Sequence, residues 1–129
     1  MAVSESEILS IELPCNEQAP GTVRDALDES TETDWVLGDA MLIANELVTN
    51  AVLHSGCSGD HVLQVDVTRQ PERLLIRVRD PGLSGTEVSD RQPGSDGGWG
   101  LVIVDELAQR WGAERAEGYS VWAEIALPA

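Results

Sequence analysis

A glutamate and an asparagine lie one helical turn apart in the stretch Ala44-Asn45-Glu46-Leu47-Val48-Thr49-Asn50-Ala51. Residues at i and i+4 share one side of a helix, so Glu46 and Asn50 project in the same direction. A carboxylate and a carboxamide beside an apolar stripe are costly to desolvate unless an ion, a nucleophile or a water satisfies them. The pair is therefore a candidate for general-base chemistry or cation binding, although the same spacing also occurs on the solvated shoulder of a helix.

Two further motifs could bind a ligand together with this helix. Asp80-Pro81-Gly82 places a carboxylate at the end of a predicted strand, directly before a tight turn. Gly97-Gly98-Trp99-Gly100-Leu101 is a glycine-rich loop that opens into a predicted helix. Free N–H groups and the positive dipole end at a helix N-terminus attract phosphate groups. Each motif alone is common in turns and helix starts, so it is their combination that indicates a ligand site.

Composition limits the classes of function. The chain has 129 residues and a net charge of −15, and all eight of its basic residues are arginines. This balance argues against direct binding of nucleic acid, which needs a dense basic patch. The absence of lysine excludes a P-loop lysine, a Schiff base and Ser-x-x-Lys catalysis. An anionic ligand could still bind through backbone N–H groups and a divalent cation.

The cysteines and the apolar runs indicate a cytoplasmic protein. Cys15 and Cys57 do not make a disulfide framework in a chain of this length. No signal-peptide core and no apolar run long enough to span a membrane is visible.

The spacing of metal ligands is present in His54, Cys57 and His61, with Cys15 as a possible fourth ligand. The preferred interpretation is a polar turn in which the histidines and cysteine are incidental. A cysteine nucleophile paired with His54 is weaker still, because no orienting partner is visible.

Alternating apolar residues predict a sheet covered by helices on one side. The predicted elements are a strand over 8–13, a helix ending at 27, a helix over 38–53, strands over 61–68 and 74–80, a helix over 100–111 and a strand over 120–127. Asp80 continues the alternation of Leu74, Ile76 and Val78, so it should lie at the rim of the core face. We expect a loose segment over 1–7 and one α+β domain over 8–129. This domain should be a two-layer sandwich with a mixed, mostly antiparallel sheet. The aperiodic stretch 83–98 suggests a lid.

In this order and spacing, the three motifs resemble those of the GHKL, or Bergerat-fold, ATP-binding domains of DNA gyrase B, sensor histidine kinases and MutL. The chain is most similar to the small anti-sigma-factor and serine-protein-kinase branch (SpoIIAB/RsbW-like, HATPase_c). The segment 45–51 is similar to the first motif of that branch, 80–82 to the second, and 98–101 followed by 104–112 to the third. The end of the chain, 118–125, is similar to the last strand, so the resemblance covers about residues 8–128.

The resemblance implies roles for individual side chains. Glu46 would be the general base on an attacking hydroxyl or water. Asn50 would bind Mg²⁺, which prefers hard oxygen donors. Asp80 would accept a hydrogen bond from the adenine amino group, and Gly82 would let the base approach.

The remaining ligand contacts implied by the resemblance come from later in the chain. Gly98, Gly100 and Leu101 would direct backbone N–H groups at the phosphates of ATP or ADP. Ser120 is expected where the family often carries a threonine near the adenine.

The resemblance also implies partners and an activity. The expected function is that of a Mg-ATP-dependent serine kinase that phosphorylates a STAS-domain anti-anti-sigma partner, sequesters a sigma factor and forms a homodimer. The alternative is a nucleotide-gated protein-binding module with negligible kinase activity. Ser84 stands where the second motif often has a glycine, and Trp99 is bulky between two glycines, so both departures bear on turnover.

Overall fold

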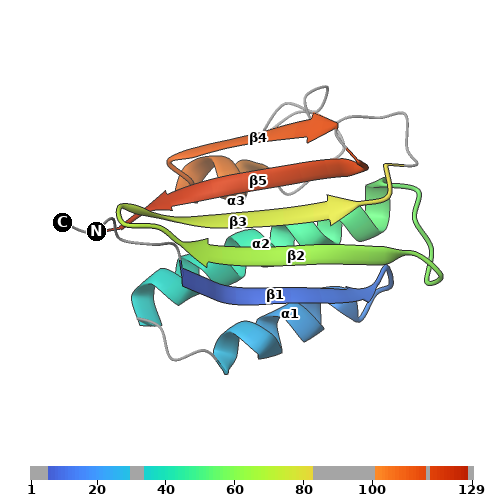
Figure 1. The fold of residues 1–129 in the computed structure, drawn as a ribbon, viewed down its shortest axis with the longest axis horizontal. Helices are drawn as coiled ribbons and strands as arrows, with labels where there is room; N and C mark the ends of the chain where they lie inside the picture. The colour runs from blue at the N-terminus through green and yellow to red at the C-terminus, as the bar shows by residue number, and fades with distance from the viewer. Residues whose placement is uncertain (1–5, 30–33, 83–100, 116, 128–129) are drawn as a thin grey trace.

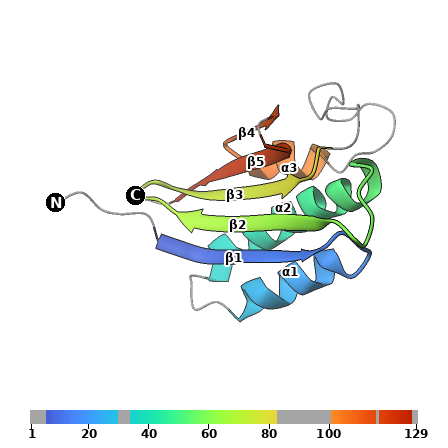
Figure 2. The same cartoon turned by 45° about the vertical axis from the view of Figure 1, so that its right-hand side comes forward.

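The computed structural model describes residues 6–29, 34–82, 101–115 and 117–127 as a two-layer structure, with a sheet on one side and helices on the other (Figures 1 and 2). In chain order the elements are β1 (Ser6–Pro14), α1 (Ala19–Asp28), α2 (Asp34–His54), β2 (Val62–Arg69), β3 (Arg73–Asp80), α3 (Leu101–Leu107), β4 (Arg110–Arg115) and β5 (Tyr119–Ala126). The lid expected over 83–98 lies outside the described residues.

The five strands of the described sheet are ordered β1-β2-β3-β5-β4. All four pairings are antiparallel, so the predicted α+β sandwich is confirmed while the sheet is antiparallel rather than mixed. In the central pair, Val65 lies opposite Val78 and Val67 opposite Ile76. These side chains are buried on one face, as strict alternation of apolar residues predicts.

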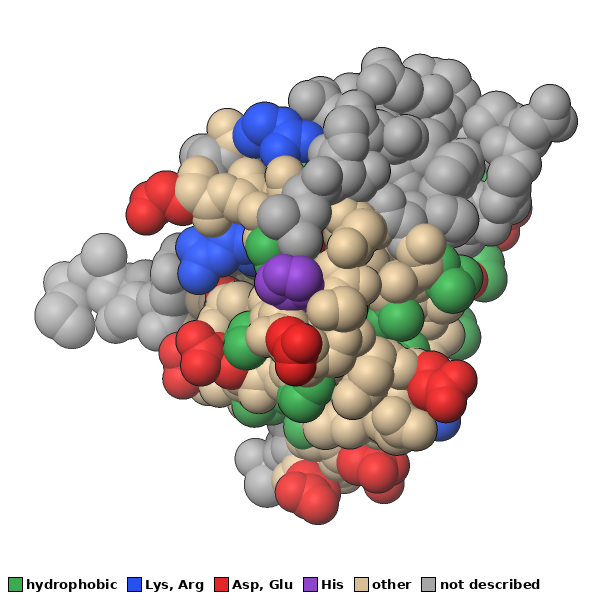
Figure 3. Space-filling view, turned by 90° about the vertical axis from the view of Figure 1, so that its right-hand side faces the viewer, with side chains coloured by type: hydrophobic (Ala, Val, Ile, Leu, Met, Phe, Trp, Pro, Cys, Tyr) green, Lys and Arg blue, Asp and Glu red, His purple; other side chains and the backbone are tan. Residues whose placement is uncertain are grey.

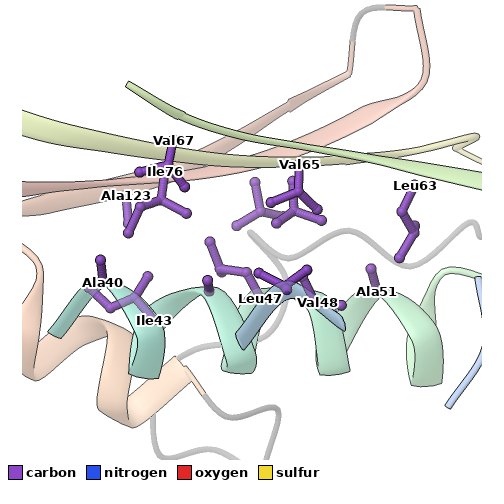
Figure 4. Close-up of a cluster of buried hydrophobic side chains, with 14 of the residues drawn as sticks. Ala40, Ile43, Leu47, Val48, Ala51, Leu63, Val65, Val67, Ile76 and Ala123 are labelled. Carbon is purple, nitrogen blue, oxygen red and sulfur yellow. The ribbon is translucent and has the colours of Figure 1, made fainter. Parts of the chain in front are cut away.

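Helix α2 anchors the core because its apolar side chains point at the underside of the sheet (Figure 4). The side chains from α2 that face the strands are Ala40, Ile43, Leu47, Val48 and Ala51. Those that meet them from the sheet include Leu63, Val65, Val67, Ile76 and Ala123. Contact along several turns fixes the rotation of α2 about its axis, and so fixes which way its polar side chains point.

The predicted helix over 100–111 is wrong in its second half. Helix α3 ends at Leu107, and the segment from Arg110 to Arg115 forms β4, an edge strand paired with β5. The change from helix to strand begins at Gln109, whose N–H donates to the carbonyl oxygen of Glu124 at 2.7 Å. The chain therefore leaves the helix to complete a sheet ladder with residues distant in sequence, a non-local contact that overrides the local helical spacing.

Gly112, which we expected to end a helix, instead lies in the middle of β4. It pairs with Trp122, and a side chain at Gly112 would approach the Trp122 indole carbon Cζ2 to 2.9 Å. The glycine therefore leaves room for the indole to lie across the edge strand. Its role is close packing rather than helix termination.

The two cysteines form a disulfide in the structure, contrary to the sequence-based expectation. Cys15 follows β1, Cys57 follows α2, and their Cα atoms are 6.1 Å apart. The same segments are also joined by a hydrogen bond from the Cys15 N–H to the His61 carbonyl oxygen, at 3.0 Å. Within the described part of the chain, no group of three or more His, Cys, Asp and Glu side chains is placed to hold a metal ion, so the metal-like spacing of these residues does not become a cluster there.

No helix in the described ranges combines the length and the apolar character needed to cross a bilayer.

Candidate functional site

Helix α2 carries Glu46 and Asn50 on the flank that faces away from α1. On the opposite flank, Arg24 of α1 donates to Asn45 Oδ1 at 3.4 Å. Successive residues on a helix are rotated by about 100°, which turns Glu46 and Asn50 away from Asn45. Because α2 packs against α1 on one side and α3 on the other, the two side chains lie on the α3 side of the core stripe.

The two side chains differ in burial. Asn50 is buried, with 5% of its surface exposed, whereas Glu46 is half-buried. Burial desolvates the Glu46 carboxylate and raises its pKa above the ordinary value of 4.5. A carboxylate with a raised pKa is a stronger base, so Glu46 is better suited to take up a proton than a fully solvated glutamate.

Asp80 is the last residue of β3, and its side chain lies on the face of the sheet that the helices cover. Its side chain is 7% exposed and continues the buried face of Leu74, Ile76 and Val78, as the alternation predicts. Helix α2 packs against the same strand. The carboxylate of Asp80 is thereby held on the side of the sheet on which Glu46 and Asn50 lie.

The turn after Asp80 requires glycine for a local reason. Gly82 has a φ of +75°, a conformation that side chains disfavour. Its N–H donates to Asp80 Oδ1 at 2.6 Å, so the turn orients the carboxylate that precedes it. The sequence motif thus corresponds to a defined hydrogen-bonded turn.

Of the expected phosphate-binding residues, Leu101 is the one that the structure describes, and it begins α3. Gly98 and Gly100, together with Ser84 and Trp99, lie outside the described residues. Helix α3 packs against α2, so its first turn belongs to the same layer as Glu46 and Asn50.

Comparison with models of protein families shows which family has this sequence. The family model described as the histidine kinase-like ATPase domain matches residues 15–125. The chain belongs to this family. The resemblance to GHKL domains drawn from the three motifs is therefore confirmed, and membership of this ATPase family implies that the chain binds ATP.

Among solved structures, the ATPase domain is similar to the RsbU and RsbW domains of Rv1364c from Mycobacterium tuberculosis. The TM-score is 0.60 at 20% sequence identity, and the match covers 98% of this chain and 34% of that chain. The chain thus spans about a third of the length of that solved structure. Among curated proteins, none matches this chain.

Ser120 does not share a face with Asp80 in this ATPase domain. Across the β3–β5 pairing, Ser120 lies opposite Arg79, and Asp80 lies opposite Tyr119. Because neighbouring residues in a strand point to opposite faces, Ser120 belongs to the side of the sheet that carries Arg77. Ser120 and Asp80 therefore lie on opposite faces of the sheet, and the expected position of Ser120 near the adenine stays a prediction.

We did not predict from the sequence that Tyr119 is the residue next to Asp80 on the neighbouring strand. Tyr119 is buried, with 5% of its surface exposed, and it is the cross-strand neighbour of Asp80. A signal was present, since Tyr119 continues the apolar alternation of Val121, Ala123 and Ile125. Extending that face by one step would have brought Tyr119, rather than Ser120, to the level of Asp80.

The arginines of the ATPase domain are concentrated in the strands. Six of the eight lie in β2, β3 and β4, namely Arg69, Arg73, Arg77, Arg79, Arg110 and Arg115. In the view of Figure 3, basic side chains lie mainly on one side, with acidic side chains beside them and over the rest of the described surface. In the described helices Arg24 is the one arginine, so most of the side-chain cations lie on strands rather than beside Glu46 and Asn50.

Proposed function

We propose that this chain is a Mg-ATP-binding regulatory protein that acts as an anti-sigma-factor-type serine kinase on a STAS-domain partner. One observation carries the proposal: Glu46 and Asn50 lie one turn apart on a flank of α2, and Asp80 is buried at the end of the strand against which α2 packs. Family membership supports ATP as the ligand.

Asn50 supplies an oxygen donor suited to Mg²⁺. The ion takes oxygen ligands in octahedral geometry and usually binds through one or two protein groups together with substrate phosphates. A buried carboxamide next to a half-buried carboxylate fits this donor chemistry. Bound Mg²⁺ would neutralise charge that develops on the transferred phosphoryl group.

Glu46 is proposed to take the proton from the attacking serine hydroxyl of the partner. Its raised pKa strengthens it as a base, provided that the pH keeps it ionised. Asp80 is proposed to accept from the adenine amino group. The backbone N–H groups of Gly98, Gly100 and Leu101 are proposed to hold the phosphates at the start of α3.

The protein partner is proposed to dock beside α1. Arg24 is exposed on this helix and reaches Asn45 on the flank of α2 opposite to Glu46, so a partner docked on α1 would have to extend its serine-bearing segment across α2 to reach the proposed base. The matched solved structure contains an RsbW domain and an RsbU domain of one protein, which supports a regulatory setting. A sigma factor sequestered by a homodimer of this chain completes the proposal.

The test is to mix purified protein, labelled ATP, Mg²⁺ and a STAS-domain partner, and to follow label on a partner serine. Glu46→Gln should lose about 10²–10⁴-fold in transfer while it keeps its affinity for ADP. Glu106→Gln, which changes an exposed glutamate of α3, is the matched control and should transfer normally. Asn50→Ala should lose the Mg²⁺ dependence of nucleotide binding.

The outcomes separate the two functions. Label on serine that disappears in Glu46→Gln supports the kinase. A stable, nucleotide-dependent complex without label supports the alternative of a nucleotide-gated binding module. Neither label nor complex with several STAS-domain and sigma-factor candidates would remove the anti-sigma proposal and leave an ATP-binding domain.

A further inference from the structure

The Asp80-Pro81-Gly82 turn is braced by the hairpin between β4 and β5. Tyr119, at the start of β5, is the cross-strand neighbour of Asp80. Arg115, at the end of β4, pairs with Tyr119 in the adjacent ladder. The hairpin that joins these two strands therefore lies directly against the turn that follows Asp80.

Two glycines allow this close approach. Gly118 has a φ of +108°, and a side chain there would run into the carbonyl oxygen of Asp80. A side chain at Gly82 would come within 3.1 Å of the Gly118 backbone and 3.0 Å of the Arg115 guanidinium. The turn and the hairpin thus meet backbone to backbone, and displacement of one would move the other.

Arg115 supplies the directional contact in this brace. Its Nη1 donates to the Gly82 carbonyl oxygen at 3.1 Å, and its guanidinium lies 5.0 Å from the centre of the Tyr119 ring. Stacking on the ring restricts the planar guanidinium, so the donor is held in place rather than supplied by a freely moving side chain. Gly82 is therefore held at both of its backbone polar groups: its carbonyl by Arg115 and its N–H by Asp80.

We infer that Arg115 is a positioning residue that sets the orientation of the Asp80 carboxylate for recognition of the amino group of adenine. This rests on the proposed adenine-binding role of Asp80. The Gly82 N–H determines where one carboxylate oxygen of Asp80 lies, and Arg115 determines where the Gly82 backbone lies. Arg115 thus acts on base selectivity through Gly82, without contacting the nucleotide.

The test compares ADP with purine riboside diphosphate, an analogue that lacks the amino group, by calorimetry. The wild type should bind ADP more tightly than the analogue. Arg115→Gln should weaken ADP by roughly tenfold, the value of about one hydrogen bond, and leave the affinity for the analogue nearly unchanged. Arg115→Lys keeps a cationic donor but loses the planar stack, so it should fall between the two and provides a second variant should Arg115→Gln fold poorly.

Arg110→Gln is the matched control. Arg110 also lies in β4 and also stacks on an aromatic ring of β5, with its guanidinium 5.9 Å from the centre of Trp122. Its hydrogen bond, however, goes to Glu124 at 2.9 Å and not to the turn. If the inference is correct, Arg110→Gln changes the ratio of the two affinities by less than about twofold, which is within ordinary surface effects.

The inference and the proposed function fail in different ways. Equal weakening of ADP and analogue in Arg115→Gln, or no weakening of either, would leave Arg115 as a structural residue and overturn the inference. Equal affinity of the wild-type protein for ADP and the analogue would instead overturn the role of Asp80. A wild-type protein that binds neither would overturn nucleotide binding itself.

Discussion

Reduction of the Cys15–Cys57 disulfide should lower the free energy of unfolding substantially. The bond joins the segment after β1 to the segment after α2, across a sequence separation of 42 residues. Reduction is a cleaner perturbation than substitution because it leaves both sulfur atoms in place. Cys15 is buried in the core, so Cys15→Ser would add the cost of burying a hydroxyl group to the loss of the link.

The magnitude follows from the length of the closed loop. For a separation of 42, the chain-entropy relation gives a restriction of the unfolded state of about 13 cal/mol/K, or about 4 kcal/mol at room temperature. Native domains are stable by roughly 5–15 kcal/mol, so this contribution is large. With a urea m-value of about 2 kcal/mol/M, the midpoint of unfolding should fall by roughly 2 M on reduction.

The assay is urea unfolding of the oxidised and the reduced protein, with free thiols counted by alkylation and mass spectrometry before each titration. The Cys15→Ser/Cys57→Ser double variant is the control, because a reductant should not change its midpoint. Two alkylatable thiols in the untreated native protein would refute the bond itself. A confirmed bond with a midpoint that does not move on reduction would refute the reasoning from loop length.

Three further predictions follow from the core, the site and the turn. Leu47→Ala should cost about 2–5 kcal/mol in chemical denaturation because Leu47 is 1% exposed, whereas Leu42→Ala on the same helix, at 51% exposure, should cost far less. Because burial raises the pKa of Glu46, the acid limb of single-turnover phosphoryl transfer should lie above the ordinary pKa of 4.5; it should vanish in Glu46→Gln, and an unchanged limb in that variant would assign it to another group. Gly118→Ala should weaken ADP binding and lower the melting temperature together, since its methyl group meets the carbonyl oxygen of Asp80; normal values of both would contradict the described contact.

The parts of the fold that could be predicted from sequence are those with strong local periodicity. Strands β2 and β3 differ by one residue from the predicted ranges, because their apolar residues alternate without interruption. Helix α2 was predicted over 38–53 and spans Asp34–His54. Its core stripe is continuous, so the pattern placed Glu46 and Asn50 on one flank without knowledge of any tertiary contact.

The features that were missed depend on contacts between distant parts of the chain. Nothing in the local sequence shows that Cys15 and Cys57 meet, because their approach is set by how β1 and α2 pack. Strand β4 was hidden because Leu101, Val104, Ala108 and Trp111 have helical spacing, although only the first part of that segment is a helix. The face of Ser120 depends on the register between β3 and β5, which a single strand cannot reveal.

The misassigned strand matters for function as well as for fold. A helix continued to Trp111 would carry Arg115 into a loop, with no fixed relation to Asp80. As an edge strand, β4 instead turns back through Glu117 and Gly118, whose φ values of +51° and +108° suit a tight hairpin that follows the twist of the strands. Because of that hairpin, Arg115 donates a hydrogen bond to Gly82, and Tyr119 lies beside Asp80 on the neighbouring strand. Motif spacing therefore located the groups proposed to contact the nucleotide, whereas the groups that hold them in place emerged only from pairing between strands that no local pattern specifies.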